Sequence, residues 1–215
     1  MSEYMNDDDR VQVLRKWWEG NGTSLVVTLV VVIAAVIGWR WYTDYTQTRE
    51  EAASATYQRY LEARQHDAKP EELAALLATL DNDFRSSGYR IFTLFYRAHD
   101  AATADNVAKA SEYLETAVTD AKDDRLRDIA RLRLARLQMQ ANDADAALVT
   151  LSKVAGTGFR SYVAELKGDI LLGQNKPDAA REAYQAAASA ADPNEPQPVL
   201  DMKIVDLTKP NAPAP

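Results

Sequence analysis

The feature that most constrains the fold of this chain is an uncharged run near its N-terminus, from Gly20 to Trp39. Its centre reads SLVVTLVVVIAAVIGW. About twenty helical residues rise roughly 30 Å, which is the thickness of the hydrocarbon core of a bilayer. Valine is abundant here, but a lone segment in lipid satisfies its backbone polar groups only as a helix. The run therefore predicts one transmembrane helix at residues 23–41, with the lipid bilayer as a partner of the chain.

The tryptophans of the chain lie at the two ends of this run. Trp17 and Trp18 precede it, Trp39 and Trp41 close it, and Tyr42 extends the second group. Aromatic rings prefer the two membrane–water interfaces, so this placement supports a span. A cleaved signal peptide is the alternative reading. The length of the run and the aspartates before it favour a retained anchor.

The orientation of the span is indicated by the basic residues beside it. Arg10, Arg15 and Lys16 form a short cluster before the run, although basic residues also follow it. The short positive flank favours a cytoplasmic N-terminus, so we predict that residues 1–22 are a short cytoplasmic tail. Within this tail, residues 11–18 fit either a helix lying on the membrane surface or a simple extension of the membrane helix.

Residues 42–192 are helical by composition, because Ala, Leu, Glu, Arg and Gln dominate and Gly and Pro are sparse. Three blocks within them carry small or apolar residues at the same spacings of 12, 4 and 3, and the blocks follow one another at offsets of 37 and 33. The positions are Ala98, Ala110, Leu114 and Ala117; Ala135, Ala147, Leu151 and Val154; and Gly168, Ala180, Tyr184 and Ala187. This pattern resembles the tetratricopeptide repeat of about 34 residues.

The spacings have a physical reason. Two antiparallel helices joined by a tight turn approach closely, so the residue at their crossing must be small. The larger residue four positions later lies on the same helical face and fills the space beside it. The predicted helix-packing positions are Ala98, Ala110, Ala135, Ala147, Gly168, Ala180 and Tyr184. Polar residues predict the tight turns, at Asp105-Asn106, Asn142-Asp143 and Gln174-Asn175-Lys176-Pro177.

The flanks of the three blocks are also helical in pattern. Residues 45–64 read as a long helix continuing from the anchor, and residues 70–80 read as a second helix with proline in its first turn. This pair is a candidate leading repeat. The proline-rich tail, residues 193–215, contains a predicted short helix at 199–207 that caps the last repeat. Its apolar alternation leaves a strand as the alternative, and residues 209–215 are predicted to be disordered.

The sequence offers no pattern for catalysis, cofactor binding or metal binding. It has no cysteine, and its two histidines, His66 and His99, lack a nearby partner at catalytic or metal-binding spacing. Neither a glycine-rich phosphate loop nor a Gly-x-Ser-x-Gly motif occurs. A net charge of -7 without a basic stripe disfavours nucleic acid, because phosphate neutralisation supplies most of that affinity. We therefore predict a protein that is not an enzyme, needs no cofactor and binds no nucleic acid.

The tetratricopeptide resemblance implies a ligand-binding concave face, lined by the first helix of each pair. Its inward positions lie six and three residues before the small residue of each block, then one and four after it. In this sequence they are Phe92, Phe95, His99 and Ala102; Ile129, Leu132, Arg136 and Met139; and Tyr162, Glu165, Asp169 and Leu172. The large apolar members are the candidate protein-binding residues, namely Phe92, Phe95, Ile129, Leu132, Met139, Tyr162 and Leu172. The alternative is a groove that the leading or the C-terminal helix already fills.

The order of elements, taken over nearly the whole chain, resembles the YfgM-like proteins, which are ancillary subunits of the bacterial SecYEG translocon. The residues that carry the resemblance are IGWRWY at 37–42, RLAR at 133–136, ADAAL at 144–148, and MKI at 202–204 with Leu207. The resemblance implies an all-α, single-pass protein of the bacterial inner membrane. Its N-terminus is expected in the cytoplasm and its tetratricopeptide-like α-solenoid in the periplasm.

The resemblance also implies partners. These are the SecYEG translocon, a membrane-anchored periplasmic chaperone of the prolyl-isomerase type, and unfolded export clients. The implied function is a binding scaffold that helps newly exported chains pass from the channel to chaperones. Two alternatives stay open, namely a regulator whose cytoplasmic tail sequesters a stress-response regulator, and an envelope-assembly tether.

Overall fold

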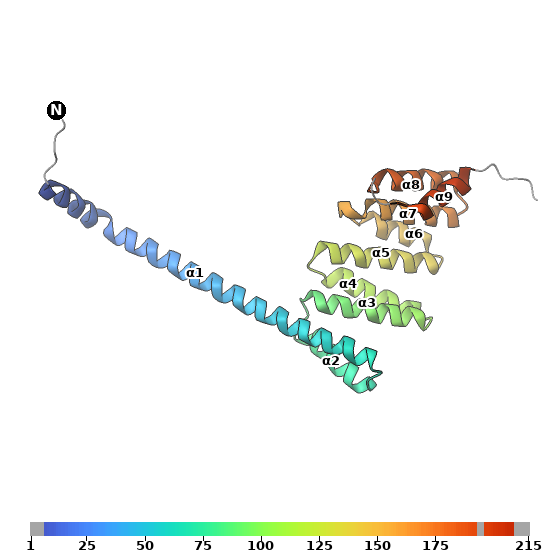
Figure 1. The fold of residues 1–215 in the computed structure, drawn as a ribbon, viewed down its shortest axis with the longest axis horizontal. Coiled ribbons are helices and arrows are strands. Elements are labelled where there is room, and N and C mark those ends of the chain that lie inside the picture. The colour runs from blue at the N-terminus through green and yellow to red at the C-terminus, as the bar shows by residue number, and fades with distance from the viewer. Residues whose placement is uncertain (1–6, 193–195, 209–215) are drawn as a thin grey trace, which may run out of the picture. The chain divides into compact units, whose positions relative to one another are not determined.

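The computed structural model of the chain describes residues 7–192 and 196–208, and within these ranges it contains helices and no strand. The all-α class expected from the sequence is thus confirmed. The chain divides into two compact units, Met1–Ala52 and Ala53–Pro215. Figure 1 labels the α-helices, and the elements in chain order are α1 (Asp7–Gln65), α2 (Pro70–Asn82), α3 (Gly88–Thr103), α4 (Val107–Asp120), α5 (Asp124–Gln140), α6 (Ala144–Ser152), the short 3-10 helix η1 (Thr157–Phe159), α7 (Arg160–Gly173), α8 (Pro177–Ala190) and α9 (Pro198–Thr208).

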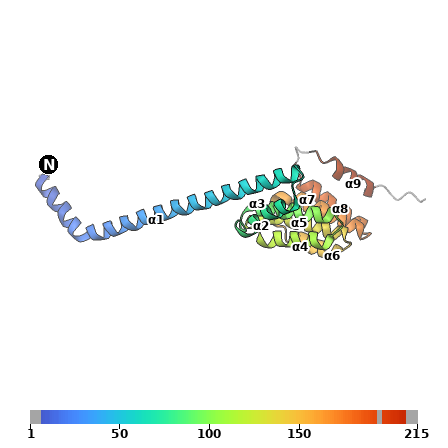
Figure 2. The same cartoon turned by 90° about the horizontal axis from the view of Figure 1, so that it is seen from below.

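The first unit is the N-terminal part of α1. Its aliphatic side chains are exposed, for example Leu25, Val30 and Ile37 at 43%, 58% and 62%. A helix that is apolar on all sides and packs against no protein is suited to lipid. Within the described residues, α1 is the helix that is long and apolar enough to cross a membrane, as the sequence predicts. Residues 11–18 belong to the same uninterrupted helix, which bends in its N-terminal portion (Figure 2).

The second unit begins with the last turns of α1, which pair with α2. Tyr60 is 1% exposed and Leu80 is fully buried, so the two helices contribute large side chains to the interior of this unit. The helices predicted at residues 45–64 and 70–80 are both present, and α2 extends to Asn82. Pro70 occupies the first turn of α2, where its missing N–H leaves no hydrogen bond unmade.

The helix hairpins share one type of turn. Among the described residues, positive φ occurs at Asp67 (48°), Asp105 (59°), Asn142 (62°) and Asn175 (59°), residue types that tolerate the left-handed conformation. In each turn the next backbone N–H donates to the carbonyl five residues earlier. These bonds run from Ala68 to Ala63 (2.9 Å), Asn106 to Ala101 (2.8 Å), Asp143 to Gln138 (2.9 Å) and Lys176 to Leu171 (3.0 Å). The turn at Asp67 therefore identifies α1–α2 as a leading copy of the hairpin.

The second helix of each hairpin starts in one of two ways. In α4 and α6, the side chains of Asn106 and Asp143 each accept the backbone N–H three residues on, at 3.1 Å. In α2 and α8, Pro70 and Pro177 stand in the first turn instead. The side-chain cap pairs a backbone N–H that the first turn of a helix would leave unbonded, and proline has no N–H to leave unbonded. Either arrangement allows a helix to start directly after the turn.

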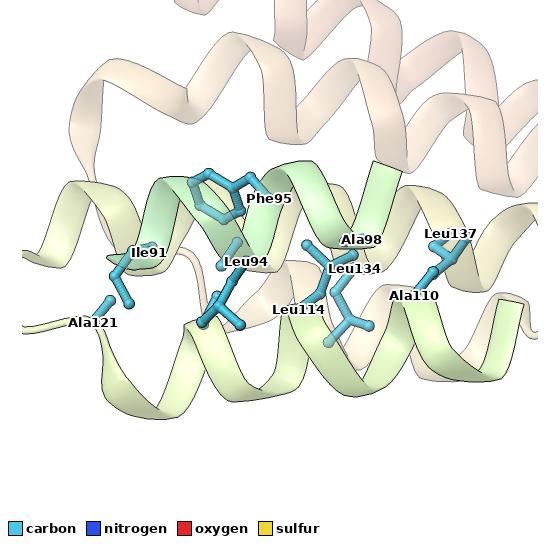
Figure 3. Packing of buried hydrophobic residues seen from close by; sticks show 11 residues of the cluster. Ile91, Leu94, Phe95, Ala98, Ala110, Leu114, Ala121, Leu134 and Leu137 are labelled. Atoms are coloured by element: carbon cyan, nitrogen blue, oxygen red, sulfur yellow. The ribbon is translucent and has the colours of Figure 1, made fainter. Parts of the chain in front are cut away.

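Small residues lie where the helices of each hairpin cross. All seven predicted helix-packing positions are buried, and six of them are alanine or glycine. Figure 3 shows the first of these crossings, where Ala98 of α3 and Ala110 of α4 share a cluster with Leu94, Leu114 and residues of α5. A second cluster of buried apolar residues packs α5, α6 and α7 together, and a third packs α8 with α9. The same kind of apolar interior therefore occurs along the whole row of repeats.

The C-terminal helix α9 covers the last hairpin. Leu200 is 2% exposed and packs with Ala180, Tyr184 and Ala187 of α8. The Lys203 ammonium group donates hydrogen bonds of 2.7 Å to Glu165 and to Asp169 on α7. The capping helix expected from the sequence is therefore present, and the strand alternative is wrong. The predictions made for residues 1–6, 193–195 and 209–215 lie outside the described residues.

Candidate protein-binding groove

A cavity of about 620 Å³ opens between the end of α1 and the helices α3 and α5. We call it the α3–α5 groove. Its lining residues are Tyr57, Phe92, Phe95, Tyr96, Ala98, His99, Ala102, Leu114, Arg133, Arg136, Leu137 and Gln140. Five of the twelve predicted inward positions are among them, including His99 and Arg136. The groove therefore lies on the first-helix face of the repeats, where the tetratricopeptide pattern places a ligand.

One wall of the groove is aromatic. The rings of Tyr57 and Phe92 lie 5.9 Å apart between their centroids, and Tyr89 packs 5.4 Å from Tyr57. Tyr96 meets Tyr60 edge to face at 6.3 Å. Burial, together with the neighbouring hydroxyl of Tyr96, raises the pKa of Tyr57 to about 12, so its hydroxyl stays neutral well into the alkaline range. The wall offers neutral, rigid rings to a partner.

The facing wall, on α5, is basic. The Arg133 guanidinium lies 4.3 Å above the centroid of the Phe95 ring. Arg136 lies 5.2 Å from the centroid of the Tyr162 ring and donates a hydrogen bond to the Tyr162 hydroxyl. Burial is the main cause that lowers the pKa of the Arg133 guanidinium. Among its neighbours, Tyr162 acts to raise this pKa and Arg136 acts to lower it. This guanidinium is thus partly desolvated, although the residue as a whole counts as exposed.

An ion pair stands beside the aromatic wall. Arg64, near the end of α1, donates a 2.9 Å hydrogen bond from Nη2 to Oδ1 of Asp100 on α3. The same guanidinium lies 5.1 Å from the centroid of the Tyr96 ring. The hydrogen bond from Arg64 lowers the pKa of the Asp100 carboxyl, outweighing the effect of burial. The pair fixes the last turn of α1 against α3 at the edge of the groove.

Comparison with known proteins identifies the family. The chain matches the model of the tetratricopeptide repeat-like domain over residues 15–209. It is 30% identical to the "Ancillary SecYEG translocon subunit" of Escherichia coli (strain K12), over 97% of this chain and all of that protein. The chain belongs to the family of ancillary SecYEG translocon subunits. The likewise named proteins of Haemophilus influenzae and Neisseria gonorrhoeae are 27% and 23% identical over 96% of this chain and the whole of each relative. No solved structure matches the chain.

The α3–α5 groove brings together only Phe92 and Phe95 of the seven candidate binding residues. Phe95 is 6% exposed, so it forms the floor. Leu132, also 6% exposed, is a core residue between α5 and α7. Ile129, Met139 and Tyr162 are partly buried against the cores, and Leu172 is 43% exposed. The expected apolar strip along all three blocks is interrupted because α5 packs directly on α7.

The chain itself packs against the expected groove at its first block and fills it at its third block. Tyr57 of α1 packs on Phe92 at the first block. At the third block, Lys203 of α9 holds Glu165 and Asp169, two of the predicted inward positions. The alternative of a groove filled by its end helices therefore holds at the third block. The stretch between α3 and α5 stays open.

The sequence did not point to five of the residues that line the groove, namely Tyr57, Tyr96, Arg133, Leu137 and Gln140. A signal for two of them was present. Tyr96 and Arg133 each stand two residues before the small residue of their block, and three residues before the predicted inward positions His99 and Arg136. Residues three apart on a helix share a face, so the inward stripe is wider than four positions.

Proposed function

We propose that this protein is a membrane-anchored scaffold at the SecYEG translocon, which holds newly exported chains and passes them to periplasmic chaperones. It acts by binding rather than by catalysis. The observation that carries the proposal is the open α3–α5 groove, on a domain whose chain also contains a helix able to span the membrane. Family membership supports the translocon as the site of action.

The proposed topology places the N-terminus in the cytoplasm and the repeat domain in the periplasm. It is supported by the short basic cluster at Arg10, Arg15 and Lys16, because positive flanks stay on the cytoplasmic side. The chain has no cysteine, so Glu3→Cys and Ala190→Cys each create a unique thiol. In intact spheroplasts, an impermeant maleimide should label position 190 and spare position 3. Labelling in the reverse pattern would overturn the periplasmic assignment.

The groove is suited to an extended polypeptide. Tyr and Arg are the residue types that dominate the binding energy of protein interfaces, and here they face one another across an open cavity. Tyr96 is 37% exposed, so its ring is available to a partner. An unfolded export client or a chaperone segment could bury apolar side chains against these rings. A membrane-anchored chaperone of the prolyl-isomerase type is the proposed recipient.

The test is affinity capture of the full-length protein from membranes in a gentle detergent, with identification of what co-purifies. Translocon subunits and a membrane-anchored prolyl isomerase are expected. Tyr96→Glu should weaken capture of the chaperone or client, because it places a charge in the aromatic wall. Val149→Glu is the control, since Val149 is 56% exposed and lies on α6, outside the groove. Capture of a stress-response regulator without translocon subunits would overturn the proposal.

A further inference from the structure

The α3–α5 groove differs in charge from the rest of the protein. The chain has 32 acidic residues against 25 basic ones. The residues that line the groove nevertheless include Arg133, Arg136 and His99, and none of them is an aspartate or glutamate. An acidic protein therefore presents a basic and aromatic surface at its candidate binding site.

The two groove arginines also lack the carboxylate partners that nearby arginines have. Ion pairs in the surrounding helices join Arg64 to Asp100, Arg90 to Asp81 and Asp120, Arg97 to Asp81, and Arg131 to Asp128. Among the residues that the structure describes, neither Arg133 nor Arg136 forms an ion pair. Arg133 lies over the Phe95 ring and Arg136 bonds to the Tyr162 hydroxyl, so both are held in place by neutral groups.

This arrangement favours a carboxylate ligand. A guanidinium group is weakly hydrated, stacks on aromatic rings and still presents several N–H donors in its plane. Its hydrogen bonds to a carboxylate are among the strongest that side chains form, more so where water is partly excluded. Arg133 and Arg136 stand three residues apart on α5, which places them on one helical face. One acidic side chain could reach both of them.

We propose that the α3–α5 groove binds an extended acidic segment of another polypeptide. In this mode, an aspartate or glutamate side chain pairs with Arg133 and Arg136, and a neighbouring aromatic or aliphatic side chain packs on Phe92 and Tyr96. Charge complementarity selects this occupant, because the groove carries positive charge only. The inference rests on the proposed function in taking this groove as the binding surface, and it adds the chemistry of the segment that is recognised.

The test uses the full-length protein in detergent micelles and a pair of fluorescent peptides. One peptide has a Phe-Glu-Phe-Asp core between Gly-Ser flanks, and the other replaces Glu with Gln and Asp with Asn. Fluorescence anisotropy should show the acidic peptide binding about ten-fold more tightly, a difference that shrinks as salt screens the charges. Arg133→Gln together with Arg136→Gln should remove the preference. Arg125→Gln is the matched control, on the same helix but outside the groove.

A charge reversal sharpens the test. Arg133→Glu with Arg136→Glu should reverse the preference, so that a peptide with lysine at both acidic positions binds best. Circular dichroism and melting of each variant establish that the repeats remain folded. A variant that unfolds is replaced by the single exchange Arg136→Gln, which truncates only an exposed side chain and should by itself weaken binding of the acidic peptide.

Two outcomes overturn the inference and leave the proposed function intact. Equal binding of the acidic and amide peptides, lost in Phe92→Glu, means that the groove binds clients by apolar contact alone. Absence of binding by either peptide, while translocon subunits still co-purify, means that the groove is not the recognition site for such segments. The converse result is that the acidic peptide is still preferred but neither translocon subunits nor a chaperone are captured. That result would contradict the proposed function and support this inference.

Discussion

Gly168 on α7 lies so close to Tyr184 on α8 that a Cβ atom at position 168 would sit 2.3 Å from Cε1 of the tyrosine ring. The ring is 1% exposed, and its hydroxyl donates a 2.8 Å hydrogen bond to Asp169. The ring therefore cannot turn aside without losing both burial and that bond. The other blocks have alanine and leucine at the equivalent positions, so the third block exchanges a smaller residue on one helix for a larger one on the other.

The Gly168–Tyr184 contact predicts that Gly168→Ala destabilises the protein. Overpacking a core costs about 1–3 kcal/mol, against a gain of about 1 kcal/mol from replacing glycine in a helix. Thermal melting should therefore show a lower midpoint. Gly173→Ala on the same helix is the control, since nothing lies within 4 Å of a Cβ there, and it should melt at or above the wild-type temperature. An unchanged midpoint for Gly168→Ala would mean that the α7–α8 crossing is looser than the structure shows.

Two candidate binding leucines, Leu132 and Leu172, should differ in how much their truncation lowers the stability of the protein. Leu132 is 6% exposed and belongs to the core between α5 and α7, so Leu132→Ala should lower the free energy of unfolding by about 2–5 kcal/mol. Leu172 is 43% exposed, so Leu172→Ala should change it by no more than about 0.5 kcal/mol. Chemical denaturation of both variants measures the difference. Equal, small effects would return Leu132 to the binding surface that the sequence alone suggested.

The cap formed by α9 should depend on one face of that helix. Leu200 is 2% exposed against α8, whereas Met202, two residues on, is 59% exposed. Leu200→Ala should release α9 and speed its removal by limited proteolysis, because the truncation leaves a cavity and weakens the apolar contact that covers the last hairpin. Met202→Ala should leave the cleavage rate unchanged. Similar rates for the two variants would show that α9 is not held by this contact.

The Arg64–Asp100 pair predicts a stability difference that depends on pH. The folded-state pKa of Asp100 is lowered, so its stabilisation is fully present above the ordinary aspartate value of about 3.9. It is lost as pH falls through the lowered value. Because the Asp100 side chain is 45% exposed, Asp100→Asn should cost no more than about 1 kcal/mol at neutral pH. Melting in strongly acid buffer should show no difference from wild type.

The matched control for this titration is Glu115→Gln, an exposed carboxylate on α4. It should melt like the wild type at both pH values. A deficit of Asp100→Asn that persists in acid would mean that the substitution acts through packing against α1 and not through the charge of the carboxylate.

The sequence by itself determined the features that depend on neighbouring residues. The uncharged run at residues 20–39 specifies a helix apolar on all sides, and the spacing of Ala98, Ala110 and their equivalents specifies helix hairpins. Asp105, Asn142 and Asn175 mark turns because their own side chains tolerate the left-handed backbone that a tight helix hairpin needs. Each of these is a property of a short segment, so it can be read without knowing what lies across from it.

Only the tertiary structure decided which inward positions stay open. Phe95 and Leu132 each lie three residues before the small residue of their block, yet Leu132 is enclosed by α7 while Phe95 lines the groove. Lys203 donates hydrogen bonds to the carboxylates of Glu165 and Asp169, although it lies more than thirty residues away along the chain. Whether an apolar side chain is core or surface, and whether an arginine is paired, depends on helices distant in sequence. Local periodicity carries no information about the distance between those helices.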